Sequence, residues 1–509
     1  MSGNDSALKG LEMSEKPPLR DLVVILPGIL GSVLQKDGKD LWAVSGQAIG
    51  DILRTLGESL NNLRVQQDDP DSEDLADGIR AVRLIEDAQI IPGLVKVDGY
   101  TQTTRMISDG FSGVIRGNIH EDSGDKAANL YHFPYDWRRD NRVAAKILKR
   151  RLDIRLRRWR EYSGNTDAKV ILLAHSMGGL VSRYYLEVLG GWQDCKALFT
   201  FGTPYRGSLN AVDFLSNGYK KLFIDLTEVM RTMNAVYQLM PRYKALQIGS
   251  DYYRIAESPV ELPNIDRNKA KDALAFHDEI DNAADANKEN ANYRSTFVTC
   301  PIVGVVQPTK QSAVLAGGVI TTSEAMPQWL QDRPQLSDGD GTVPQVSATP
   351  VQMNDLEALS VVDYIAESHG ALQNQPNILL NLLKGIQSAQ TASLEDVRGS
   401  LEIVSRGKRS GMKGIGLSLD DLYLINEPIT LRVKVTGDAP FNALTAEISC
   451  ASHNRPSIVR DFVSVDGNWI MTTDGLAAGL YRVKVQTDNL SDEGPTPVHN
   501  LFEVAAIEE

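Results

Sequence analysis

The hydrophobic pattern of the first 400 residues alternates between short apolar runs and longer amphipathic stretches. Residues 22–26 read Leu-Val-Val-Ile-Leu, and further largely apolar runs occupy 170–174, 198–201 and 301–306. Continuous runs of this length are typical of strands that are buried on both faces of a sheet. Between them, residues 145–162 place apolar side chains on one face of a helix. Strands that alternate with helices predict an α/β fold.

The pattern changes after about residue 420. Residues 429–435 and 481–486 alternate apolar and polar side chains with a period of two, and turn-forming residues such as Asp466 and Gly467 lie between them. This alternation is typical of half-buried strands, and no helical period interrupts it. The tail therefore predicts an antiparallel β-sandwich of immunoglobulin-like size. The stretch before it is rich in Gly, Lys, Arg and Ser and predicts a linker.

Composition narrows the class of protein. The 509 residues are 42% hydrophobic and 23% charged, as in a soluble globular protein, and the net charge of −13 argues against a nucleic-acid partner. The three cysteines are few and widely spaced, which is typical of a reducing compartment rather than of a disulfide framework. Neither a signal-peptide pattern nor an 18-residue apolar run is visible, so we expect a cytoplasmic protein whose contact with lipid is at most peripheral.

The strongest chemical motif is Ala-His-Ser-Met-Gly-Gly at residues 174–179, which follows an apolar strand and precedes an apolar helix. A serine in a sharp strand-to-helix turn is the nucleophile elbow of α/β-hydrolases. The turn requires small residues two positions before and after the serine, and Ala174 and Gly178 occupy those positions. We therefore assign Ser176 as the candidate nucleophile; a chance turn is the alternative.

A serine nucleophile needs a base and an orienting acid, which follow it in that fold in the order acid, then histidine. Of the histidines beyond the serine and before the linker, His277 lies in a charged inserted stretch and His369 in a polar loop before an apolar helix. The loop position favours His369 as the base. Asp340 is flanked by two glycines and is our choice for the acid, with Asp338 as the rival two residues away.

An acyl-transfer site also needs two backbone N–H donors for the oxyanion. One should be the amide of Met177, which directly follows the nucleophile. The other should be the amide of Ile29 in the loop after the first strand, where Gly28 and Gly31 permit a turn toward the serine.

Taken together, the motifs resemble those of the lecithin:cholesterol acyltransferase and lysosomal phospholipase family. The resemblance runs from residue 22 to about 383, and it rests on residues 27–32, 94–100, 133–138 (Phe-Pro-Tyr-Asp-Trp-Arg), 174–179, 202–208 and 339–343. It implies the same nucleophile, acid and base as above, and lipid esters as substrates. Animal members carry a disulfide-tied lid, for which this chain has no cysteine pair, and the β-sandwich tail is not part of the usual family pattern.

The expected organisation is an α/β-hydrolase domain over 17–404 with a lid insertion at about 209–296, a linker over 405–419 and the sandwich over 420–509. We expect the sandwich to be separable from the catalytic unit; the alternative is that it packs on the hydrolase and helps to hold the lid. Within the insertion, apolar residues recur at steps of four and three and predict one amphipathic helix that forms a lid or acyl-chain groove, or a packed cap; these residues are Leu222, Leu226, Val229, Met233, Val236 and Met240.

The sequence thus predicts a serine lipase, phospholipase or O-acyltransferase that works through an acyl-enzyme. A carboxylesterase or thioesterase acting on soluble substrates is one alternative, and a partner-binding protein with a vestigial hydrolase is another. We expect neither a metal nor a cofactor, because a Ser-His-Asp mechanism uses none. The expected partners are a lipid ester and a protein that binds the sandwich.

Overall fold

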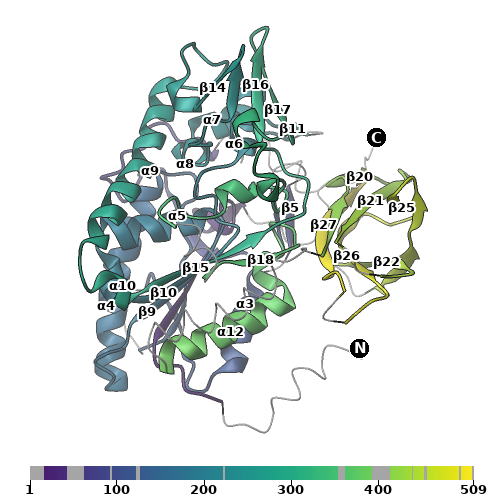
Figure 1. Ribbon diagram of the computed structural model, residues 1–509. Coiled ribbons are helices and arrows are strands. Elements are labelled where there is room, and N and C mark those ends of the chain that lie inside the picture. The colour runs from purple at the N-terminus through teal and green to yellow at the C-terminus, as the bar shows by residue number, and fades with distance from the viewer. Residues whose placement is uncertain are drawn as a thin grey trace.

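A parallel sheet forms the centre of the chain in the computed structural model (Figure 1). The structure describes residues 16–42, 62–86, 88–91, 95–121, 127–221, 224–353, 361–391, 413–437, 440–451, 455–491 and 494–506. The sheet has seven strands in the order β18-β15-β10-β9-β1-β8-β7. Their bounds are β1 (Leu22–Leu26), β7 (Arg116–Asn118), β8 (Leu130–His132), β9 (Val170–His175), β10 (Cys195–Phe201), β15 (Val298–Gly304) and β18 (Asp363–Ile365).

Helices cover both faces of this sheet because its strands are apolar on both sides. Alternate residues of β1 point to opposite faces, so Leu22 and Val24 belong to one core and Val23 and Ile25 to another. The first core is closed by α4 (Asn141–Ser163) and α5 (Met177–Arg183), and the second by α3 (Thr101–Gly110) and α12 (Pro376–Thr391). Neighbouring strands of this sheet all pair in parallel. The predicted α/β-hydrolase fold is confirmed.

A cap is inserted between β10 and β15, as the sequence predicts. It contains α6 (Leu209–Asn217), β11 (Lys220–Lys221), β12 (Ile224–Asp225), α7 (Thr227–Thr232), α8 (Asn234–Gln238), β13 (Leu246–Ile248), β14 (Asp251–Tyr253), α9 (Arg267–Lys288) and α10 (Tyr293–Thr296). The hairpin of β16 (Ser312–Ala316) and β17 (Val319–Ser323) joins the cap although it follows β15, because β16 pairs with β13. In Figure 1 α6, α7 and the β16–β17 hairpin lie above the sheet, whereas α9 runs down one side of it to α10.

The prediction of one continuous amphipathic helix over 222–240 is wrong. The chain forms α7 and α8, which are separated at Met233 by an extended backbone (φ −84°, ψ 117°). At the break, Lys269 donates a hydrogen bond from Nζ to the carbonyl oxygen of Thr232 at 2.8 Å. This tertiary contact satisfies one of the carbonyl groups that the end of α7 leaves without a helical partner. Leu222 lies outside the described residues.

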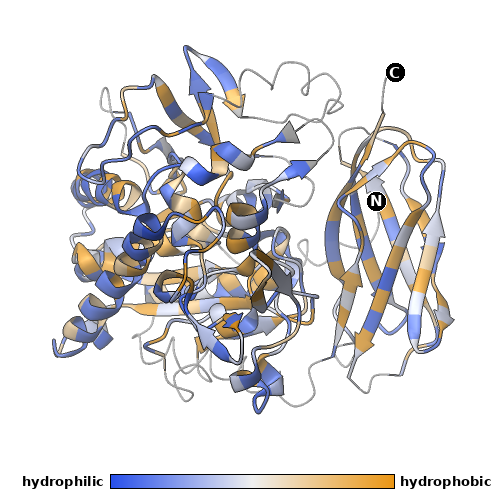
Figure 2. Cartoon of the chain, turned by 90° about the horizontal axis from the view of Figure 1, so that it is seen from above, coloured by the Kyte–Doolittle hydropathy of each residue, from blue (hydrophilic) through white to orange (hydrophobic). Residues whose placement is uncertain are grey.

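The tail forms a sandwich of two sheets (Figure 2), ordered β19-β21-β25-β24 and β20-β27-β26-β22-β23. The prediction of a linker over 405–419 is wrong for its last residues. Residues 414–418 form strand β19, which pairs with β21 and buries Ile415 and Leu417 in the sandwich core. Residues 405–412 lie outside the described ranges. The strands are β19 (Gly414–Ser418), β20 (Leu422–Leu424), β21 (Ile429–Thr436), β22 (Leu444–Cys450), β23 (Ile458–Asp461), β24 (Val463–Val465), β25 (Asn468–Thr473), β26 (Gly479–Thr487) and β27 (Val498–Ala505).

The helices and the cysteines of the described residues have two further features. Within the described ranges, the helices are too short or too polar for any of them to cross a membrane. All three cysteines lie within the described ranges, and none of them forms a disulfide. The thiol of Cys195 is buried, and burial raises its pKa, so it is held in the unreactive protonated form.

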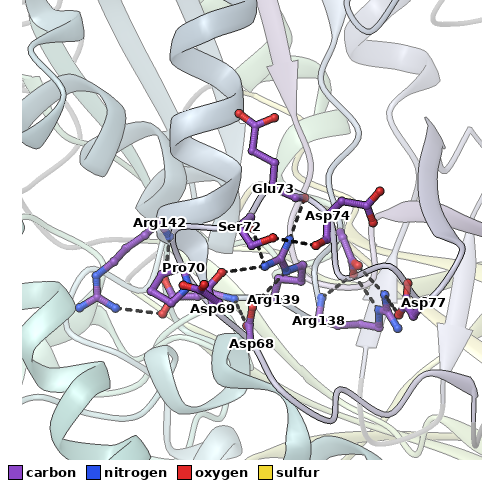
Figure 3. Close-up of polar contacts among 12 residues, drawn as sticks. Asp68, Asp69, Pro70, Ser72, Glu73, Asp74, Asp77, Arg138, Arg139 and Arg142 are labelled. Carbon is purple, nitrogen blue, oxygen red and sulfur yellow. Dashed lines mark hydrogen bonds and ion pairs between the residues drawn. The ribbon is translucent and has the colours of Figure 1, made fainter.

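A buried arginine fixes an acidic segment to the start of α4 (Figure 3). Arg139 donates to the carboxylate of Asp68 at 3.0 Å and to the backbone oxygens of Asp69, Ser72 and Glu73 at 2.8 to 3.0 Å. Arg139 is 4% exposed and Asp68 2%. Because the guanidinium takes the place of solvent for these carbonyl groups, the segment depends on it.

We predict that Arg139→Met destabilises the protein by about 3 to 5 kcal/mol, because removing one partner leaves a buried carboxylate uncompensated. Urea unfolding followed by tryptophan fluorescence measures the change. The matched control is Lys149→Met, which breaks the half-exposed ion pair with Asp153 and should cost about 0.5 kcal/mol or less. Equal losses in both variants would contradict this account.

Candidate active site

Ser176 lies at the sharp turn between β9 and α5. Its backbone has φ 52° and ψ −125°, a strained conformation for a residue with a side chain. The turn is possible because Gly178 and Gly179 have no side chains: a Cβ at Gly178 would lie 2.5 Å from the carbonyl oxygen of Pro27, and one at Gly179 would lie 2.0 Å from Thr203 Oγ1. The predicted elbow is therefore present in the structure.

The structure brings the three residues predicted from the sequence into one hydrogen-bonded row. His369 Nε2 lies 3.0 Å from Ser176 Oγ, and His369 Nδ1 lies 2.7 Å from Asp340 Oδ2. All three side chains are buried or nearly so. With a proton on Nδ1, the imidazole presents its unprotonated Nε2 to the serine, which is the tautomer that a general base requires.

The acid loop holds Asp340 firmly. Its Oδ1 accepts hydrogen bonds from the amides of Thr342 at 2.9 Å and Val343 at 2.7 Å, which leaves Oδ2 for His369. Asp338 is not in this row: its own backbone carbonyl accepts a hydrogen bond from the amide of Gln345 instead, and burial raises the pKa of its carboxyl group. Of the two acids considered, Asp340 is the one that contacts the imidazole.

Hydrogen bonds hold the backbone of His369 at both its N–H and its carbonyl group. Its N–H donates to the carbonyl oxygen of Asp340 at 2.8 Å, and its carbonyl oxygen lies 3.0 Å from His175 Nε2. Because a carbonyl only accepts, His175 carries its proton on Nε2. His175 Nδ1 must then accept from the hydroxyl of Tyr100, 3.0 Å away, and that hydroxyl oxygen accepts from the amide of Gly28. Burial, with His369 beside it, lowers the pKa of His175 to about 3, so the ring stays neutral.

The candidate oxyanion loop lies directly against the nucleophile. A Cβ at Gly28 would lie 2.8 Å from Ser176 Cβ, and Ile29 lines the same cavity as the serine. As the first residue of α5, Met177 has an N–H without an intrahelical partner. The positions of these two amides suit the predicted role.

The segment at 133–138 holds this loop in place. Tyr135 donates from its hydroxyl to the carbonyl of Pro27 at 2.9 Å, and Trp137 donates from Nε1 to the carbonyl of Ser32 at 3.0 Å. The amide of Tyr135 also donates to Ser32 Oγ at 3.1 Å. This segment, one of the motifs on which the family resemblance rests, therefore supports the loop next to Ser176.

An apolar cavity opens at Ser176 and His369 and extends under the cap. Its walls include residues of α6, α7 and α8, so the stretch predicted as a lid or acyl groove does line the space next to the serine. The apolar side chains around it include Ile29, Leu30, Leu63, Phe214, Leu226, Val229, Met230, Met233, Val236 and Leu239. Such a surface suits a hydrocarbon chain.

Sequence reasoning set His277 aside, and the structure places it in α9 with Nε2 2.8 Å from the carbonyl of Gln238. It did not single out Tyr100 or His175, although both belong to motifs named above. It also missed Gly202, where a Cβ would lie 2.6 Å from Asp340 Oδ2. The glycine before Thr-Pro at residues 203–204 was the signal, because only a residue without a side chain leaves room for the acid and the base.

Comparison with known proteins agrees with the family resemblance. Residues 117–389, more than half of the chain, match the sequence model of lecithin:cholesterol acyltransferase. Among curated proteins none matches. The lipase BlEst2 of Bacillus licheniformis resembles the chain at 14% identity in its mature form, over 73% of this chain and 94% of its own, with a TM-score of 0.30. Its propeptide form is 12% identical over 96% of this chain and 94% of its own, with a TM-score of 0.31. A PKD domain of an M14-like peptidase from a Thermoplasmatales archaeon is 8% identical over 19% of this chain and 99% of its own, with a TM-score of 0.15.

We predict that Asp340→Asn lowers kcat on a soluble ester by roughly a hundredfold or more, because the amide would favour the wrong imidazole tautomer; in a serine protease the corresponding change costs about ten-thousand-fold. Asp338→Asn should change kcat by less than about threefold, since Asn tolerates the positive φ of 59° at that position. Steady-state turnover of p-nitrophenyl butyrate measures both. A larger loss of kcat in Asp338→Asn than in Asp340→Asn would mean that Asp338, two residues earlier, is the catalytic acid.

Proposed function

The chain belongs to the lecithin:cholesterol acyltransferase family, and from this premise we propose that it is a serine hydrolase that transfers acyl groups from lipid esters. The coarse class, an acyl-ester hydrolase or acyltransferase, follows from the family. The observation that carries the finer proposal is the row from Ser176 through His369 to Asp340 at the mouth of an apolar cavity.

In the first half-reaction, His369 Nε2 removes the proton from Ser176 Oγ while that oxygen attacks the ester carbonyl carbon. The carbonyl oxygen becomes negatively charged and accepts hydrogen bonds from the amides of Ile29 and Met177. The tetrahedral intermediate collapses, His369 gives its proton to the leaving alcohol, and the acyl group remains on Ser176. Asp340 stabilises the imidazolium and keeps its orientation throughout.

In the second half-reaction, water or an acceptor alcohol gives its proton to His369 Nε2 and attacks the acyl-enzyme. The new acid or ester leaves, and Ser176 takes the proton back. Both outcomes use the same residues, so the enzyme is a lipase or phospholipase when water is the acceptor and an O-acyltransferase when an alcohol is.

The shape of the cavity favours a long acyl chain over a small soluble ester. Side chains from α7 and α8 line it, including Val229, Met230 and Val236, and so does Met233 between the two helices. Each buried CH₂ of a substrate is worth about 0.8 kcal/mol, so a chain of ten or more carbons gains far more from this surface than an acetyl group does. We therefore favour phospholipids and related lipid esters, with a soluble-ester carboxylesterase or thioesterase as the second candidate.

We predict that Ser176→Ala remains folded and loses both turnover of phosphatidylcholine vesicles and covalent labelling by a fluorophosphonate. The hydroxyl is the group that forms the covalent bond, so no residual labelling at this site is expected. Intact-mass spectrometry measures the labelling, and circular dichroism verifies the fold. Ser182→Ala serves as the control because its buried hydroxyl donates to the carbonyl of Gly178 and lies outside the row. Full labelling of the Ser176 variant would remove that residue from the mechanism.

We predict that Val229→Phe shortens the preferred acyl chain, because Val229 lines the cavity and is buried. The value of kcat/KM for p-nitrophenyl palmitate should fall by about tenfold or more, which is the size of effect expected when overpacking costs 1 to 3 kcal/mol. Turnover of the butyrate ester should change by less than about threefold. Val319→Phe, at an exposed position in β17, is the matched control. A uniform effect on both esters would favour the soluble-ester alternative.

A further inference from the structure

The sandwich touches the loop that carries the candidate base. Glu367, two residues before His369, is fully buried, and its Oε1 accepts hydrogen bonds from the amides of Ser368 at 2.9 Å and His499 at 2.8 Å. Its Oε2 lies 2.8 Å from His499 Nδ1. Ser368 returns the contact by donating from its hydroxyl to the carbonyl oxygen of His499. Because His499 belongs to β27, one residue of the tail binds both residues that precede the base.

The Glu367 carboxylate acts on the pKa of His499. Burial by itself would lower the pKa of the imidazole, but the Glu367 carboxylate, with Asp98 beyond it, outweighs burial and the nearby Lys484, so the pKa is raised. The contact joins this imidazole to a carboxylate that is fully buried. A hydrogen bond in which one partner is ionised is shorter and stronger than one between neutral groups.

A second strand of the sandwich reaches the acid loop. The side chain of Gln307 donates from Nε2 to the carbonyl of Ile415 at 2.9 Å and accepts from the amide of Leu417 at 3.0 Å, so it pairs with β19 as another strand would. The backbone of Gln307 exchanges hydrogen bonds with Gly339, the residue before Asp340, at 2.9 and 3.2 Å. Gln307 is 2% exposed.

We propose that the C-terminal sandwich is a positioning element for the reaction: β27 holds the base loop through His499 and Glu367, and β19 holds the acid loop through Gln307. The proposal rests on the proposed function, since it concerns the placement of His369 and Asp340. These tail residues do not touch the substrate. They act by fixing the two loops whose backbones are themselves joined by the hydrogen bond from His369 N–H to the carbonyl of Asp340.

The sandwich and the catalytic domain are joined mainly by specific polar pairs and only to a small extent by apolar packing. The apolar contact between the two units is small and centres on Ala88 and Leu501. Polar pairs surround it: Arg482 with Asp98 at 2.7 Å, and Lys96 with Asp421 and Asn500. A small apolar patch by itself would leave the units free to move. Glu367 and Gln307, through which the sandwich contacts the base and acid loops, are both buried.

This arrangement changes the expectation that the sandwich can be removed without effect. A fragment ending near residue 404 would lose the partner of Glu367 and leave a buried carboxylate beside the base. It would also leave the side chain of Gln307 unpaired. The loops would then be free to relax, and a shift of about 1 Å in a reacting group can cost a hundredfold in rate.

The test uses the full chain with four substitutions. His499→Leu removes the imidazole and its donor, and His499→Gln keeps a donor for Glu367. Gln307→Leu removes the side chain that pairs with β19, and Arg482→Met breaks the interface ion pair with Asp98. Fluorophosphonate labelling rate, kcat and KM for p-nitrophenyl butyrate, and thermal midpoint are measured for each. The proton NMR signal of His369 Nδ1–H reports the bond to Asp340.

We expect His499→Leu to lower the labelling rate and kcat by about tenfold to a hundredfold, with KM within about twofold. The downfield proton signal should shift or broaden. His499→Gln should recover most of the rate, and Arg482→Met should stay within about twofold of wild type even though its thermal midpoint falls. Gln307→Leu should lower kcat to a similar extent, because it releases the loop that carries Asp340.

The outcomes separate the inference from the function on which it rests. A wild-type protein that is not labelled at Ser176 contradicts the proposed function. A labelled wild type with His499→Leu equal to Arg482→Met in every readout overturns the positioning role, and so does a gain of activity in His499→Leu, which would mean that the sandwich restrains the site. If His499→Leu does not fold, the comparison of His499→Gln and Gln307→Leu with Arg482→Met decides by the same criteria.

Discussion

The hydrogen bond between His369 Nε2 and Ser176 Oγ joins two residues that are 193 positions apart, and the rest of the structure is organised around that 3.0 Å contact. One end is fixed by the strained turn after β9, which needs the glycines at 178 and 179. The other end is a loop that carries no regular structure of its own. Its position therefore depends on neighbours: the carbonyl of Asp340 on one side and the ring of His175 on the other. A base on a loop is accurate only when such contacts determine its backbone.

Three structural units converge on this loop. The central sheet supplies His175, which is the last residue of β9 and stays neutral because burial lowers its pKa to about 3. The oxyanion loop is joined to the same ring through the hydroxyl of Tyr100 and the amide of Gly28. The sandwich contributes His499. A displacement of any one of these units would be felt at the imidazole, because the hydrogen bonds form a connected chain of largely buried groups.

Much of the catalytic domain could be predicted from the sequence, because the signals are local. An apolar run such as residues 22–26 has few alternatives to a buried strand, and the order serine, acid, histidine selected Asp340 and His369 from small sets. The break at Met233 could not be predicted, since the hydrogen bond that satisfies the end of α7 comes from Lys269, 37 residues away from Thr232. The contact of Glu367 with His499 spans 132 residues and has no local signature. The strand at 414–418 was hidden because glycine alternates with its two apolar residues.

The account is tested most directly by the crystal structure of the protein after reaction with a long-chain p-nitrophenyl phosphonate, whose phosphorus mimics the tetrahedral intermediate. We predict phosphorus bonded to Ser176 Oγ, with the phosphonyl oxygen at about 3 Å from the amides of Ile29 and Met177. The alkyl chain should lie in the cavity against Val229 and Met233. An adduct on another residue, an oxygen turned away from both amides, or a chain that lies in solvent while the cavity stays empty would contradict it.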